Sequence, residues 1–176
     1  MEEQKKNNVS DVTAETVNIT QGGARNVTGT IVTLRQAGAQ SVTADNLVIR
    51  QGGVVKAQAD QLEMLQGGIV LAQTQTANLT ASEAGVVLSD GDVTMAQAGA
   101  QLLLARGDVT MDQSGAVAMV ARNVKAENSG TVFLFARQVE GTVNTAFGPR
   151  ESVIFGAVAG AVAGLVLLLA RLARRR

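Results

Sequence analysis

Four aspartates are the residues of this sequence that most resemble a site for chemistry. Asp90, Asp92, Asp108 and Asp112 lie within a short stretch and could bind a cation at turns of the chain. A calcium ion takes about six to eight oxygen ligands, and the sequence does not supply a full set here. We therefore interpret these carboxylates as solvated turn residues and predict no metal site.

The composition excludes most catalytic chemistry. The 176 residues contain no Cys, His, Trp or Tyr. Disulfides, thiol nucleophiles, the usual zinc and haem ligands and His acid–base catalysis are therefore excluded. Fifteen basic residues balance fifteen acidic ones, so the chain has no net charge to attract nucleic acid. We predict a protein that is not an enzyme and has no cofactor, no small-molecule substrate and no nucleic-acid partner.

A repeated phrase of apolar–x–apolar–x–Gln–small–Gly runs along most of the chain. Clear copies are VNITQGG from Val17, LVIRQGG from Leu47 and VTMDQSG from Val109, and the final glycine recurs at a nearly constant interval. We assign one glycine column to these positions and place Gly85 in its fifth turn. The other glycines of the column are Gly23, Gly38, Gly53, Gly68, Gly99, Gly115 and Gly130.

Small or apolar residues also follow a finer rule inside each repeat. They occur in pairs every five residues, as in Val27/Gly29, Val32/Leu34 and Ala37/Ala39. Two inward residues per five fit neither a 3.6-residue helix nor a long alternating strand. The pattern predicts an all-β fold, a triangular parallel β-solenoid of about nine 15-residue coils that rises ~4.8 Å per coil. A larger, flatter coil, of which one repeat is only half, remains the alternative. The irregular stretch from Thr80 to Gly107 predicts a loop or a change of register.

Outward residues form two further columns. Six glutamines, Gln21, Gln36, Gln51, Gln66, Gln97 and Gln113, are expected to stack as an amide ladder at a corner and to stabilise the fold. The glycine column has two explanations. Each turn could require positive φ just after the glutamine, or a second molecule could approach a face without side chains.

Large apolar residues accumulate beside the glycine column in the later turns. Their exposed area would be on the order of 1,000 Å², more than soluble monomers usually tolerate. We expect a neighbouring copy to cover them, with a homotrimer around a three-fold axis favoured and dimers or larger rings left open. The predicted interface is Val70, Leu71, Val87, Leu88, Leu102, Leu104, Val117, Val120, Val132, Phe133 and Phe135.

The C-terminal part predicts a membrane anchor. The predicted order is a polar segment (1–11), the solenoid (12–147), a linker (148–151), one transmembrane helix (152–170) and a basic tail (171–176). The nineteen residues of the helix carry no charge and could span ~30 Å of hydrocarbon. Three glycines four residues apart would let two such helices pack closely: Gly156, Gly160 and Gly164.

Orientation and charge add two expectations. The polar N-terminus is not a secretory signal, which favours a solenoid on the cytoplasmic side, although the arginine tail argues for the opposite orientation. One corner carries Arg106, Arg122 and Arg137 near the predicted membrane, and Glu15, Asp45 and Asp60 further away. That gradient suits anionic headgroups, or else it is ordinary solvated charge.

The repeating coils resemble those of parallel β-helix proteins, among them the bactofilins, at the level of architecture. The resemblance implies a column that can stack end to end into filaments, whereas Gly148 and Pro149 would lead from the last turn into the bilayer. We predict a membrane-anchored structural or scaffold protein that associates laterally with itself. The alternative is a membrane-tethered binding module that recruits a protein partner through an exposed face of the solenoid.

Overall fold

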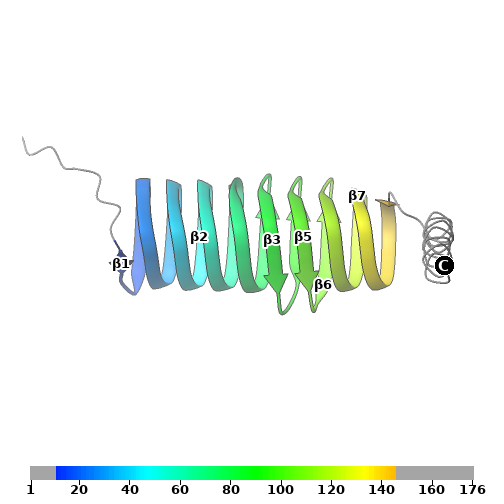
Figure 1. Cartoon of the computed structure of the whole chain (residues 1–176), viewed down its shortest axis with the longest axis horizontal. Helices are drawn as coiled ribbons and strands as arrows, with labels where there is room; N and C mark the ends of the chain where they lie inside the picture. The colour runs from blue at the N-terminus through cyan, green and yellow to red at the C-terminus, as the bar shows by residue number, and fades with distance from the viewer. Residues whose placement is uncertain (1–10, 146–176) are drawn as a thin grey trace, which may run out of the picture.

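The computed structural model describes residues 11–145, and in this range the chain is all β, a parallel solenoid without a helix (Figure 1). No helix within the described range is long and apolar enough to cross a membrane. The predicted anchor, with Gly156, Gly160 and Gly164, lies outside this range. The elements are β1 (Val12–Thr13), β2 (Thr16–Thr80), β3 (Glu83–Ser89), β4 (Val93–Ala96), β5 (Gly99–Ala105), β6 (Asp108–Asp112) and β7 (Gly115–Thr145).

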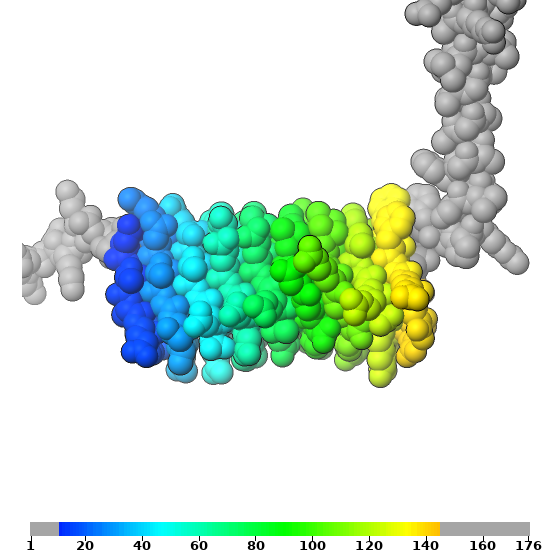
Figure 2. Space-filling model, turned by 90° about the horizontal axis from the view of Figure 1, so that it is seen from below, coloured from blue at the N-terminus to red at the C-terminus, as the bar shows by residue number. Residues whose placement is uncertain are grey.

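Consecutive turns pair in parallel. Val12 lies beside Val27, and Ile69 lies beside Ala84, so each residue has as its neighbour the residue one repeat later. A half-coil of a flatter solenoid would place those residues on opposite walls, so the repeat is one complete turn. Figure 2 shows the turns as a continuous column, with N-terminal and C-terminal turns at opposite ends.

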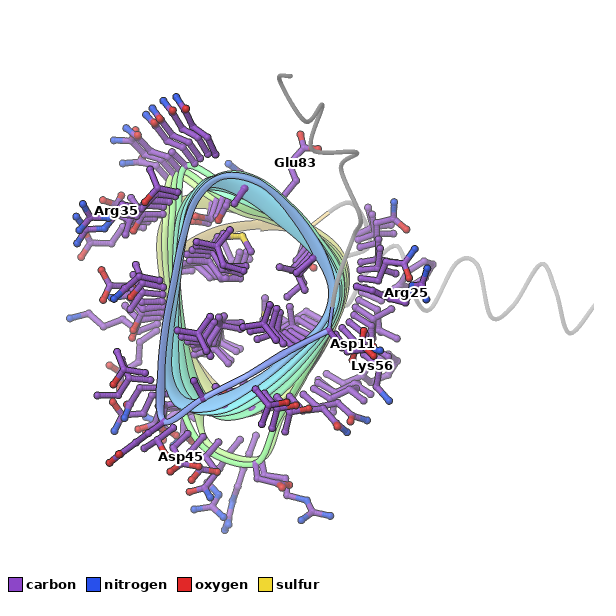
Figure 3. All side chains as sticks on the ribbon, turned by 90° about the vertical axis from the view of Figure 1, so that its left-hand side faces the viewer. Asp11, Arg25, Arg35, Asp45, Lys56 and Glu83 are labelled. Carbon is purple, nitrogen blue, oxygen red and sulfur yellow. The ribbon has the colours of Figure 1, made fainter. Side chains whose placement is uncertain are left out.

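The core follows the predicted pairs of inward residues. Val27, Val32 and Leu34 are buried, as are Ala37 and Ala39 in the next wall of the turn. Viewed along the column, these side chains stack inside the closed tube while charged side chains lie outside it (Figure 3). Because burial of aliphatic side chains is the main favourable term in folding, this column of stacked rows stabilises the fold.

The glutamine corner has a left-handed backbone. Positive φ occurs at Gln21, Gln36, Gln51, Gln66, Ala81, Gln97, Gln113 and Asn128. These eight corners bound seven complete turns, with partial turns before the first and after the last, so the solenoid has about seven turns where the sequence predicted about nine. The expectation that glycine after the glutamine carries the positive φ was wrong, because the glutamine itself does. Gly22, with φ 130°, is the one glycine after such a corner that has positive φ in the described range.

The predicted amide ladder is present. Gln21 donates to Gln36 at 3.4 Å, Gln36 to Gln51 at 3.3 Å, and Gln51 to Gln66 at 3.2 Å. Beyond the interruption at Ala81, Gln97 donates to Gln113 at 3.5 Å. These amide contacts offset part of the cost of holding non-glycine residues in the left-handed region.

The expected irregularity lies at a different corner. Ala77 pairs with Val93, and Val93 pairs with Val109, so two successive turns are each one residue longer than the 15-residue turns around them. The extra residues fall where β3 passes to β4 and where β5 passes to β6. Asp92 stabilises these stacked loops by accepting a hydrogen bond of 2.8 Å from the backbone N–H of Asp108.

Replacement of Ala81 with glycine tests the left-handed corner. Ala81 has φ 47° and no side-chain amide to extend the ladder. A81G should raise the free energy of unfolding by about 1 kcal/mol, because glycine adopts positive φ without steric cost. Thermal unfolding measures the change. The control is A118G, because Ala118 lies in a strand and does not have positive φ. This change should lower the free energy of unfolding. Equal effects of the two changes would contradict a strained backbone at Ala81.

Replacement of either of two buried serines with alanine should affect the free energy of unfolding differently. The Ser82 hydroxyl is buried without a hydrogen-bond partner in the described structure, so S82A should be neutral or stabilise by up to about 1 kcal/mol. The Ser114 hydroxyl donates to the Asp112 carbonyl at 2.7 Å and accepts from the Ala98 N–H at 3.2 Å. S114A should cost about 1–3 kcal/mol, since it leaves that N–H unpaired. Denaturant unfolding of both variants tests the contrast.

Candidate assembly surface

The pairing of the strands shows that one residue predicted for the glycine column, in its fifth turn, does not belong to it. Gly68 pairs with Glu83, and Glu83 pairs with Gly99, so a carboxylate occupies the place that the sequence analysis gave to Gly85. Gly85 lies further along the same strand and contacts the backbone of Val70. The seven other predicted glycines, from Gly23 to Gly130, lie in one column, two residues after the left-handed corner of each turn.

Neither backbone nor packing requires glycine in this column. The described glycines with positive φ are Gly22 and Gly141, which lie outside it. A Cβ added at Gly38 would lie 3.4 Å from the Gly53 carbonyl oxygen, and one added at Gly53 would lie 3.7 Å from that of Gly68. Those are ordinary van der Waals distances. The column therefore presents an outer face without side chains that the fold of one chain does not demand.

A shallow groove follows the C-terminal half of this column. Its floor consists of Gly99, Gly115 and Gly130 with the neighbouring alanines, and Val117 and Val132 line it from the next column. Glu83 and Asn144 stand among its lining at the two ends. The groove carries no cluster of polar groups that would orient a small ligand.

Large apolar side chains stand beside the groove. Val70 is 60% exposed, Val117 51%, Phe133 48% and Phe135 67%. Half-buried leucines extend this apolar surface in two neighbouring columns. Leu71 and Leu102 lie in one of these columns, and Leu88 and Leu104 lie in the other. We call this surface the apolar ridge: Val70, Leu71, Val86, Leu88, Leu102, Leu104, Val117, Val120, Val132, Phe133 and Phe135.

One predicted interface residue was wrong. Val87 is completely buried and pairs with Ala72 and Leu103 in the core. Its neighbours Val86 and Leu88 face outward, and the sequence analysis missed Val86. Both this error and the misplaced Gly85 come from one cause. Aligning Gly85 with the glycine column shifts the register of the turn, whereas the true extra residues lie at the opposite corner, after Ser89.

The acidic residues near the extra loops do not assemble a metal site. Asp90 pairs with Arg106 at 2.9 Å, and Asp108 accepts a hydrogen bond of 2.7 Å from Asn123. In residues 11–145 no group of three or more His, Cys, Asp or Glu side chains could hold a metal ion. The carboxylates instead bind neighbouring turns to one another on an exposed corner.

Comparisons of the chain with family models, curated proteins and solved structures gave no match. The class of the protein, a parallel β-solenoid, therefore rests on its own geometry.

Adjacent glycines provide a matched test of the side-chain-free face. G53A should leave stability unchanged or raise it by about 0.5–1 kcal/mol, because a Cβ fits and alanine restricts the unfolded chain. G52A should destabilise the fold, because its Cβ would overlap the Ala37 carbonyl oxygen. Thermal unfolding of the two variants decides the point. A large loss in G53A would show that the fold itself needs this glycine column.

Proposed function

We propose that this protein is a membrane-anchored structural protein whose solenoids associate side by side through the apolar ridge. The observation that carries the proposal is the exposure of large aliphatic and aromatic side chains at Val70, Val117, Phe133 and Phe135, stacked along one flank of the column. Water-exposed apolar area of this continuity is typical of surfaces that meet another molecule.

A second copy suits this surface because of its shape. The ridge and the glycine column both run parallel to the solenoid axis, since the glycine column is built from one position of the repeat and the ridge from three nearby positions. A neighbouring column can therefore follow them over many turns. The missing side chains along the glycine column let a neighbouring backbone or ridge approach closely, as small residues do wherever chains pack tightly.

The anchor supplies the second half of the proposal. Residues 152–170 have the length and apolar composition of a membrane span, and the basic residues that follow suit a membrane boundary. Anchors in one bilayer hold solenoids parallel to one another and raise their local concentration. We propose three copies around an axis parallel to the columns, with the solenoid on the cytoplasmic side, as a scaffold or spacer at the membrane surface.

Polar substitutions on the ridge test the proposal. In the full-length protein in detergent, V70T/V117T/F135T should reduce the oligomer to smaller species, because the change removes apolar contact area while Thr retains β-propensity. Analytical ultracentrifugation over a range of protein concentrations measures the effect.

The matched control is I31T, since Ile31 is also exposed, at 45%, but lies outside the ridge. It should leave the mass unchanged. A wild-type protein that is monomeric at all concentrations would overturn lateral association through the ridge, and the surface would then meet lipid or a different protein.

A further inference from the structure

The groove along the glycine column ends where the described part of the chain ends. Its floor follows one column of the repeat from Glu83 to Asn144, which lies beside Gly130 in the next turn. Four turn-to-turn steps separate Glu83 from Asn144, so the groove is about 19 Å long. Residues 146–176 follow directly and therefore begin at the Asn144 end of the groove.

The segment that follows is long enough to cover the groove. Residues 152–170 are uncharged and mostly apolar. A helix rises ~1.5 Å per residue, so about 13 residues span the groove and the whole segment spans about 28 Å. Residues 146–151 can cover up to about 20 Å when extended, which is enough for the chain to reverse direction at the Asn144 end. In water, this contact covers two apolar surfaces at once.

Small residues occur on both sides of this contact. The floor of the groove is a line of glycines and alanines that presents no large side chain. In a helix, Gly156, Gly160 and Gly164 share one face because they are four residues apart. Two surfaces of small residues let the backbones approach closely and pack densely. Val117 and Val132 then flank the helix along one side of the groove.

Glu83 stands at the far end of the groove and is the one charged residue in its lining. Figure 3 shows its side chain pointing outward from the tube. No basic side chain among residues 11–144 forms an ion pair with it. A helix of residues 152–170 that spans the groove from its other end places Arg171 about 9 Å beyond Glu83. Helical side chains tilt toward the N-terminus, so the Arg171 guanidinium reaches back to the carboxylate.

We infer that, in a chain that is not inserted in a bilayer, residues 152–170 lie in this groove and Arg171 pairs with Glu83. The contact covers Val117 and Val132 of the apolar ridge. Because segment and groove belong to one chain, the effective concentration of the segment exceeds that of a second copy. Insertion of the segment into a bilayer empties the groove and exposes the ridge. This regulation rests on the proposed function and restricts lateral association to membranes.

Thiol cross-linking of the full-length chain tests the contact, since the chain contains no Cys. The chain is synthesised in a cell-free system, either without lipid and detergent or with phosphatidylcholine vesicles. A side chain fits at Gly115, where an added Cβ would lie 3.8 Å from the Gly130 carbonyl oxygen. Without lipid, G115C/A161C should give an internally cross-linked monomer with a short bis-maleimide reagent. Vesicles should abolish the cross-link, because Ala161 then lies in the bilayer.

The matched control for position is G38C/A161C. Gly38 belongs to the same glycine column and also has room for a Cβ, but it lies about 24 Å further from Asn144 than Gly115 does. A short reagent cannot bridge this distance, so the control should give no cross-linked monomer.

Charge exchange tests the ion pair in the G115C/A161C background without lipid. E83R should lower the initial rate of cross-linking about two- to fivefold, which is the effect of losing one exposed ion pair. E83R/R171E should restore the rate to within about twofold, because it re-forms the pair with the charges exchanged. The matched control is E63R, since Glu63 is also exposed but does not line the groove. It should leave the rate unchanged.

The outcomes separate this inference from the proposed function. Absence of the cross-linked monomer, an equal yield from G38C/A161C, an unchanged yield in vesicles, or an unchanged rate in E83R would overturn it. Precipitation of the wild-type chain without lipid would also overturn it. If the ridge variant still reduces assembly in detergent in those cases, the proposed function stands without the covered groove. If the cross-link forms but the wild-type chain is monomeric in detergent, the contact stands and the proposed function is wrong.

Discussion

The structure depends on hydrogen bonding between residues that are one turn apart. Each strand segment pairs in parallel with the matching segment of the next turn, so identical positions of the repeat lie above one another. A preference at one position therefore becomes a column along the whole molecule. The amide ladder, the glycine face and the rows of buried aliphatic residues are all results of this one constraint.

Much of the fold could be predicted from the sequence because a repeat multiplies weak local signals. Pairs such as Val32 and Leu34 recur in turn after turn, and no helix or long strand reproduces their spacing. The errors occurred where a single turn departs from the repeat. Glycine also occurs in the strands outside the outward column, so Gly85 in β3 was a plausible but wrong match, and its misplacement moved Val87 from the core to the surface. The extra residues could be located only from pairings such as that of Val93 with Val109.

The candidate surfaces were less predictable than the core. Burial is decided by the repeat itself, but positive φ at the glutamines instead of the following glycines depends on how the corner closes, which the residue types alone do not show. The excess of large apolar residues beside the glycine face was visible in the sequence. Which of them face outward became clear only with the register. Glu83 likewise could be placed in the glycine column only from its pairing with Gly68 and Gly99.

The fifth turn has a consequence for how the column moves. At residues 81–83 the ladder is interrupted, a left-handed corner lacks its amide, a buried hydroxyl has no partner in the described structure, and a carboxylate replaces glycine. In a solenoid, stability is close to a sum over turns and the contacts between neighbours, so one weak turn separates two stronger segments. Amide hydrogen exchange should therefore divide into two cooperative units, one on each side of this turn, that open independently below the global unfolding energy. The short run from Ala81 to Glu83 would then be the boundary between two foldons.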